Sequence, residues 1–251
     1  MYMKKLPNAP LQEVIFEGKW ELSLDPQTSA FIDPEFQFAL GKFQHAISAR
    51  FPYHKSKIPG DIPLQILGHQ PIHQFWTGEG VWPVIQLGPG VITVNDTEKN
   101  YEWDDVFFPL VKKTLFDVKN SYVNDLSFIS YTLRYIDVVK IKDYEFSNWF
   151  DFVKDNINFQ FSNGYPLPGT LHNFKIEQSF KTEDAGLIEI GFSNGQDNQK
   201  EDIFIWQTAV TGRKQLFIEG LMEWLVLAHS HCSRIFKETC KEDFYASFVN
   251  R

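Results

Sequence analysis

Apolar and polar residues alternate with a period of two over several stretches of this chain, and the alternation indicates its fold class. Between residues 12 and 24, the apolar side chains of Val14, Phe16, Trp20 and Leu22 share one side, and charged side chains share the other. Because successive side chains of a strand point to opposite faces, this pattern predicts a half-buried β-strand.

Further strands are expected where segments alternate or are rich in β-branched and aromatic residues. They cover residues 72–77, 81–87, 91–95, 127–142, 171–181, 187–193 and 202–210. Gly88-Pro89-Gly90 joins two of them, and Pro followed by Gly at the central positions is typical of a type II turn, which predicts a hairpin. A drift of apolar parity near Ile136 and Asp137 suggests a bulge in the strand over 127–142.

Helices are expected between these strands. Asp33 is a good N-cap for the first and Pro34 suits its first turn. A second begins near Pro109 or bends there, a short third covers about 148–155, and a long fourth covers 214–240. We therefore predict an α+β fold in which helices pack on one face of antiparallel sheets, with two similar halves of strands followed by a helix.

The segment over residues 162–170 is the best candidate for a linker, because it is rich in Gly, Pro, Ser and Asn. It separates an expected N-terminal α+β unit, 1–161, from an expected C-terminal unit, 171–251, that ends in the long helix. The alternative, that the two sheets join into one compact domain, stays open at this point.

Composition excludes several classes of protein. The 251 residues include 24 Phe, 9 Tyr and 7 Trp, which is enough apolar mass for a large core and rules out a disordered chain. The net charge of −8 argues against broad nucleic-acid binding. No apolar run approaches the roughly 18 residues of a membrane helix, and no secretory signal is visible. Cys232 and Cys240 cannot form a disulfide framework, so a reducing cytoplasm is the expected compartment.

Four stretches carry a resemblance to a known family. They are an opening stretch over 9–17 (APLQEVIFE), a central motif over 87–97 (LGPGVITVNDT) with 100–103 (NYEW), a strand over 133–137 (LRYID), and Ala228-His229 on the last helix. In these the chain resembles a sporadically distributed, uncharacterised family of prokaryotic proteins. The resemblance implies no established activity, cofactor or catalytic residue. Scattered occurrence is typical of genes that move between strains, including defence and toxin–antitoxin modules, and this is analogy only.

Candidate ligand-binding residues are Arg134, Asn95, Tyr101 and His229. Arg134 lies in the middle of a predicted strand, where a buried guanidinium needs a carboxylate or a ligand anion; we favour a structural ion pair or an exposed sheet face. Asn95 ends a predicted strand next to Asp96 and Thr97, and these residue types are also common in turns and caps, which is the interpretation we favour.

Metal and catalytic sites are not expected. His229 and Cys232 are three residues apart on the predicted last helix and would give a weak pair of ligands, but no third ligand is visible. The chain contains none of the common nucleophile, zinc-protease or kinase motifs. We expect no catalytic residue, no metal and no cofactor.

Two classes of function follow. The first is a non-catalytic protein that binds another protein through aromatic surface at Trp76, Trp82 and Trp103 and acts as an accessory or regulatory component of a defence or toxin–antitoxin system. The second is an enzyme or small-ligand sensor with a pocket between sheet and helices. Missing catalytic motifs favour the first. The partner's identity and the oligomeric state are left open by the sequence.

Overall fold

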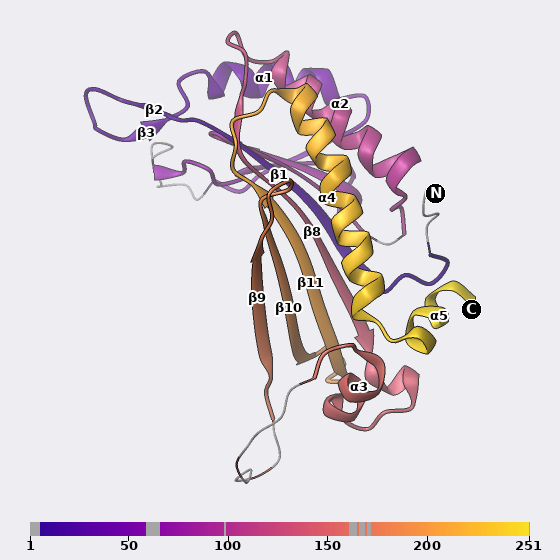
Figure 1. The fold of residues 1–251 in the computed structure, drawn as a ribbon. Helices are drawn as coiled ribbons and strands as arrows, with labels where there is room; N and C mark the ends of the chain where they lie inside the picture. Colours follow the sequence, from indigo (N-terminus) through magenta and orange to yellow (C-terminus); the bar gives the residue numbers. More distant parts are fainter. Residues whose placement is uncertain are drawn as a thin grey trace. The chain divides into compact units, whose positions relative to one another are not determined.

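The fold was determined as a computed structural model, which describes residues 6–58, 66–97, 99–160, 165, 169 and 172–250 (Figure 1). It is an α+β protein, as predicted. Its strands are β1 Leu11–Trp20, β2 Ser23–Leu24, β3 Phe31–Ile32, β4 Tyr53–Ser56, β5 His73–Gly78, β6 Val81–Gly88, β7 Val91–Asp96, β8 Phe128–Lys140, β9 Lys175–Lys181, β10 Leu187–Gln196 and β11 Asp202–Gly212. Its helices are α1 Phe36–Ile47, α2 Phe108–Lys119, α3 Trp149–Asn156, α4 Ile218–Thr239 and α5 Glu242–Asn250.

The strands form a nine-stranded sheet in the order β4-β5-β6-β7-β1-β8-β11-β10-β9, and β2 pairs with β3 in a small second sheet. The pairings of β4 through β7, of β7 with β1, and of β9 with β10 are antiparallel. A π-helical turn, Trp103–Phe107, precedes α2, and a 3₁₀ turn, Ile141–Tyr144, follows β8.

Most of the predicted elements are present, with shifts at their ends. The hairpin at Gly88-Pro89-Gly90 is confirmed, and Gly90 takes the positive φ of 74° that a type II turn requires. Helix α2 begins next to Pro109, as one of the two expectations stated. The predicted long last helix ends at Thr239, and α5 after it was not predicted. The two-residue strand β3 was also missed, because it carries too little pattern, whereas β2 falls at the end of the strand predicted over residues 12–24.

In β8 the alternation of apolar residues is interrupted near Ile136 and Asp137, but the cause is not the bulge that the sequence suggested. Tyr131, Leu133, Asp137 and Val139 are all buried, so the buried positions keep a period of two through this region. Asp137 therefore belongs to the buried face of the strand. The apolar pattern is interrupted because a carboxyl side chain occupies one of the buried positions.

The chain divides into two compact units. The β4–β7 unit comprises Val14–Leu133 and Thr211–Val226, and the β9–β11 unit comprises Met1–Glu13, Arg134–Val210 and Leu227–Arg251. The units predicted from the sequence, 1–161 and 171–251, were instead divided at an expected linker over 162–170. Most of that linker lies outside the described residues, so that division stays a prediction.

The core of the β4–β7 unit lies between its sheet and the helices α1 and α2. Phe75, Ile85, Val94 and Phe16 line up across β5, β6, β7 and β1 and are fully buried. The ring of Phe43 on α1 packs edge-on against Phe75, 5.6 Å between centroids. Burying each such side chain stabilises the fold by about 1.5–3 kcal/mol.

The core of the β9–β11 unit is mostly aromatic. Trp206 and Phe204 of β11 meet Phe152 of α3 and Phe244 and Phe248 of α5 in one buried cluster. Edge-to-face contacts recur in it, as between Phe152 and Phe244 at 5.4 Å. The short α3 and α5, which would be marginal alone, are thus held by ring packing rather than by intrinsic helix propensity.

Asp33 does not cap α1, contrary to the prediction. Helix α1 begins at Phe36, and no side chain accepts a hydrogen bond at its N-cap. The Asp33 carboxylate accepts hydrogen bonds from the Trp20 indole (3.1 Å), the Gly90 backbone N–H (3.1 Å) and the Tyr122 hydroxyl (2.7 Å). It therefore connects β1, the β6–β7 turn and the segment after α2.

Candidate functional site

The sheet of the β4–β7 unit has two different faces. One carries the apolar row described above and receives α1 (Figure 1). The alternate residues point to the other side, here called the second face. Strand register arranges them in two rows: an aromatic row of Tyr53, Trp76, Val84, Asn95 and Ile15, and an amide row of Lys55, Gln74, Gln86, Thr93 and Glu17. Trp82 and Lys19 flank the rows on β6 and β1.

Three residues of the amide row form a continuous chain of side-chain hydrogen bonds that ends on Asn95 of the neighbouring row. Gln74 Nε2 donates to Gln86 Oε1 (2.8 Å), Gln86 Nε2 donates to Thr93 Oγ1 (3.2 Å), and Thr93 Oγ1 donates to Asn95 Oδ1 (2.9 Å). Gln74, Thr93 and Asn95 are at most 7% exposed. Each buried polar group is satisfied by its neighbour, so the row keeps its amide side chains in fixed rotamers.

The aromatic row places accessible rings beside these amides. Trp76 and Trp82 are partly exposed and pack edge-to-face, 5.4 Å between centroids. Tyr53 lies directly opposite Trp76 on β4 and is 38% exposed. The pKa of Tyr53 is raised by the charge of Glu79 and by a hydrogen bond to it. Tyr53 therefore stays a neutral phenol at physiological pH, able to donate and to accept a hydrogen bond.

Charges stand at both ends of the amide row. Glu17 and Lys19 form an ion pair of 2.7 Å on β1, with about a third of each side chain exposed. Lys55 is exposed on β4 at the other end. The second face thus combines aromatic rings, fixed amides and charges of both signs on rigid strands.

The four predicted ligand residues belong to different units. Asn95 is on the second face of the β4–β7 unit, and Tyr101 precedes the π-helical turn, where its ring lies 5.8 Å from that of Phe107. Arg134 and His229 belong to the β9–β11 unit. His229 packs against Tyr135, the neighbour of Arg134 on β8, so Arg134 and His229 lie on opposite faces of that strand.

His229 is part of a partly buried polar cluster. Its Nδ1 is 2.8 Å from the Tyr135 hydroxyl, and its Nε2 is 3.4 Å from the Ser233 hydroxyl one turn along α4. Burial lowers the pKa of His229 to about 4, so the ring is neutral at pH 7.

Asp137 and Cys232 are buried in the same unit. Burial raises the pKa of Asp137 to about 8, and burial followed by the charge of Asp137 raises the pKa of the Cys232 thiol. Both groups therefore favour their neutral forms near neutral pH. Within the described residues, no group of three or more His, Cys, Asp or Glu side chains is arranged to hold a metal ion.

Trp103 was predicted to bind a partner but lies in the core. Its side chain is buried and packs against the rings of Phe107 and Phe108, at 6.2 and 5.5 Å. The apolar stripe of α2 extends back through the π-helical turn, which turns this tryptophan inward. Accessible aromatic surface from the predicted set therefore comes from Trp76 and Trp82.

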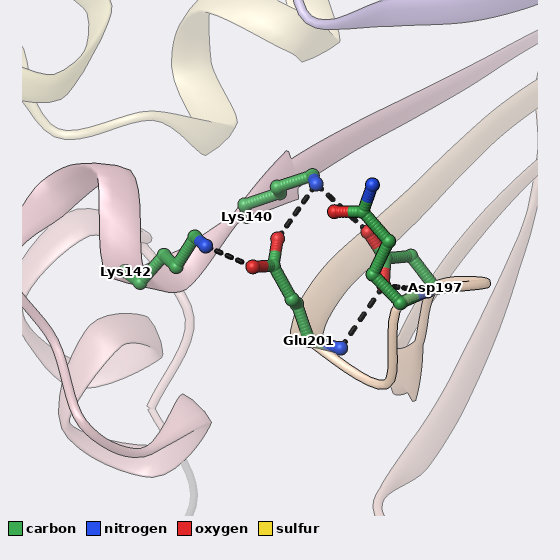
Figure 2. A network of polar contacts seen from close by, with 5 residues as sticks. Lys140, Lys142, Asp197 and Glu201 are labelled. Atoms are coloured by element: carbon green, nitrogen blue, oxygen red, sulfur yellow. Dashed lines mark hydrogen bonds and ion pairs between the residues drawn. The ribbon is translucent and has the colours of Figure 1, made fainter.

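An ion network in the β9–β11 unit was missed by sequence reasoning. Figure 2 shows Lys140 at the end of β8 between Asp197 (2.8 Å) and Glu201 (2.6 Å), and Lys142 contacts Glu201 as well. Asp197 also accepts hydrogen bonds from the backbone N–H groups of Gln199 and Glu201. The two lysines balance the charges of Asp197 and Glu201, so these ion pairs hold the loop between β10 and β11 in place and leave no net charge to attract a ligand.

Comparison with protein-family models, with curated proteins and with solved structures gives no match. Among the described residues, none of the helices has the length and apolar character needed to cross a membrane. The candidate functional site is the second face of the β4–β7 unit, with its accessible aromatic rings and its hydrogen-bonded amides.

Proposed function

We propose that this protein is a non-catalytic binding protein that grips a protein partner with the second face of its β4–β7 unit. The proposal rests on one observation: accessible Trp76, Trp82 and Tyr53 stand beside a hydrogen-bonded row of amides on the same strands. Tryptophan and tyrosine are the residue types that contribute most to protein–protein affinity.

Rigidity supports the same proposal. Side chains that are ordered before binding lose little conformational entropy when a partner arrives. The amide row is already ordered by its own hydrogen bonds, and the tryptophans hold each other in an edge-to-face pair. Charges at both ends of the row would orient a partner rather than supply most of the affinity.

The wider role we propose is that of an accessory or regulatory component of a prokaryotic defence or toxin–antitoxin system, acting in the cytoplasm. This role rests on the family resemblance alone. Cys232 and Cys240 are both free thiols, in keeping with a reducing compartment. A gene for a nuclease, kinase or toxin that is tightly linked to this one would support the role, and its absence would count against it.

The test is capture of the partner by the full chain from its native host, followed by reconstitution with the purified partner. Trp76→Ala should weaken the reconstituted complex by about 10-fold or more, the typical effect of truncating a central aromatic anchor. Phe38→Ala is the matched control, because Phe38 is 81% exposed but lies on α1, away from the second face.

Equal affinity of wild type and Trp76→Ala for the reconstituted partner would reject the proposed face. Recovery of a bound small molecule and no protein, confirmed by native mass spectrometry, would reject the proposed class of function in favour of a ligand sensor.

A further inference from the structure

Strand β9 is the last strand of the sheet in the β9–β11 unit (Figure 1). It runs antiparallel to β10, from Lys175 opposite Ser193 to Lys181 opposite Leu187. Among the described residues, no strand pairs with its other edge. An unpaired edge is a row of backbone N–H and C=O groups that can accept another strand. This edge and the second face belong to different units, so the two surfaces are tested separately.

The two ends of the β9–β10 ladder show which residues of β9 turn their backbone groups to the open edge. Thr182 N donates to Gly186 O (2.7 Å) beyond one end, and Asn194 N donates to Phe174 O (3.3 Å) beyond the other. Hydrogen-bonded and non-hydrogen-bonded pairs alternate along an antiparallel ladder, so the backbone groups of even-numbered residues face β10. Those of the odd-numbered residues over 175–181 therefore point to the open edge.

The charged side chains at odd positions form a self-complementary pattern about Ser179. Glu177 lies two residues before Ser179 and Lys181 two residues after it, while Lys175 lies four before and Glu183 four after. All five residues are exposed. Two copies of β9 paired antiparallel about Ser179 would set each Glu177 opposite Lys181 of the other copy, and each Lys175 level with Glu183.

The neighbouring registers bring like charges together. Outward backbone groups can meet only where odd residues pair with odd residues, so a two-fold axis has to pass through a residue. An axis through Gln178 places Lys175 opposite Lys181, and an axis through Phe180 places two glutamates opposite each other. Like charges directly opposite are destabilising. Lysines on an edge strand usually discourage pairing, but the register about Ser179 neutralises them.

Pairing in this register would also cover an exposed aromatic ring. Phe180 is 47% exposed and lies on the other side of β9 from the charges, together with Ile176. About an axis through Ser179, Phe180 lies opposite Gln178 of the second copy and diagonal to the second copy's Phe180. Burial of aromatic surface would therefore add to the backbone hydrogen bonds.

We propose that a second copy of this chain pairs antiparallel with β9 about a two-fold axis through Ser179, which makes the protein a homodimer. The ion pair of Lys175 with Glu177 within each copy (2.8 Å) does not oppose this pairing, because both side chains are exposed, at 67% and 70%, and such pairs contribute little. A single pair of strands is a small interface, so the dimer should dissociate at about micromolar concentrations.

The test is sedimentation equilibrium of the full chain from about 1 μM to 1 mM, where wild type should show a monomer–dimer equilibrium. Glu177→Lys and Lys181→Glu should each dimerise at least about 10-fold more weakly, because each variant sets like charges opposite each other twice in the dimer. An equimolar mixture of the two variants should dimerise as wild type does, since both pairs between positions 177 and 181 then join opposite charges.

Glu189→Lys is the matched control. Glu189 is exposed and lies opposite Ser179 on β10, one strand in from the edge. This variant should dimerise at least as well as wild type, because it reduces the net charge of −8 without altering the edge. Overall charge alone would make Glu177→Lys strengthen the dimer too, so the comparison separates the proposed register from general repulsion.

Ser179→Cys tests the register directly. The Cα atoms of a hydrogen-bonded antiparallel pair are about 5.5 Å apart, which is within the range of a disulfide. Mild oxidation should link this variant into a covalent dimer, whereas the native Cys232 and Cys240 are buried. Ser193→Cys, one strand in from the edge on β10, should not cross-link.

A wild type that stays monomeric over the whole range would overturn the proposal and leave the β9 edge to a strand of another protein. A dimer that Glu177→Lys and Lys181→Glu leave unchanged would overturn it as well, and so would a mixture that dimerises no better than its components. Positions 177, 181 and 189 are exposed, so these variants should keep the wild-type circular dichroism spectrum. Partner capture through Trp76 is measured separately and is unaffected by either result.

Discussion

At the scale of single residues, buried titratable side chains make the stability of the fold depend on pH. The carboxyl of Asp137 has a pKa of about 8 in the fold and an ordinary value of 3.8. Between these values the folded protein keeps the proton and the unfolded chain loses it, so this residue makes stability fall as pH rises from about 4 to 8. His229, whose pKa falls from 6.5 to about 4, acts in the opposite direction and lowers stability as pH falls below 6.5.

Asp137→Asn removes the loss of stability with rising pH that Asp137 causes and leaves the opposite dependence caused by His229. We expect the variant to gain stability over wild type as pH rises from 5 to 8, by about 1.4 kcal/mol per pH unit at most. Urea unfolding at a series of pH values measures the difference between the two proteins. A difference that does not change with pH would show that Asp137 ionises normally in the fold.

Asp33 allows a second prediction at this scale. Asp33→Ala leaves the buried Tyr122 hydroxyl and the Trp20 indole without the acceptor they share. Because unsatisfied buried groups cost about 1–3 kcal/mol each, the variant should be destabilised by a few kcal/mol. Asp25→Ala is a suitable control: its carboxylate also bonds nearby groups, but these lie in an exposed loop, so a small effect is expected. Similar losses in the two variants, measured by thermal unfolding, would contradict the assigned role.

At the scale of elements, the β6–β7 hairpin depends on its turn. Gly90 has a φ of 74°, and a Cβ there would come within 2.6–2.8 Å of Leu22 and His69 side-chain atoms. Gly90→Ala should therefore lower stability by more than the roughly 1 kcal/mol of the left-handed conformation alone. Gly80→Ala shares a positive φ but meets no atom within 4 Å, so it isolates the conformational cost. Equal losses of denaturation midpoint in the two variants would show that the turn tolerates the added methyl group.

The elements also show where sequence reasoning succeeds and where it stops. Period-two alternation predicted β1, runs of β-branched and aromatic residues predicted β6, β7 and β11, and Pro-Gly chemistry predicted the turn between β6 and β7, because all three signals are local. The amide row could not be predicted, since it depends on register between strands. The inward turn of Trp103 was missed because it depends on a π-helical turn with no sequence signature.

At the scale of the whole molecule, four elements contribute residues to both compact units. Strands β1, β8 and β11 and helix α4 each cross from one unit to the other, as between Glu13 and Val14 in β1. If one unit unfolded, it would disrupt its part of each shared strand and break the hydrogen-bond ladder of which that strand is a continuous part. We therefore expect one cooperative unfolding transition, although a chain of this length often unfolds in steps.

Differential scanning calorimetry should then give a single peak whose calorimetric and van't Hoff enthalpies agree. A core truncation in either unit should move the whole peak. Phe43→Ala in the β4–β7 unit and Phe244→Ala in the β9–β11 unit, both deletions of a buried ring, should each cost about 3–5 kcal/mol and lower the same transition. If instead each variant splits the peak and shifts only one part, the two units unfold independently, and the crossing strands do not couple them.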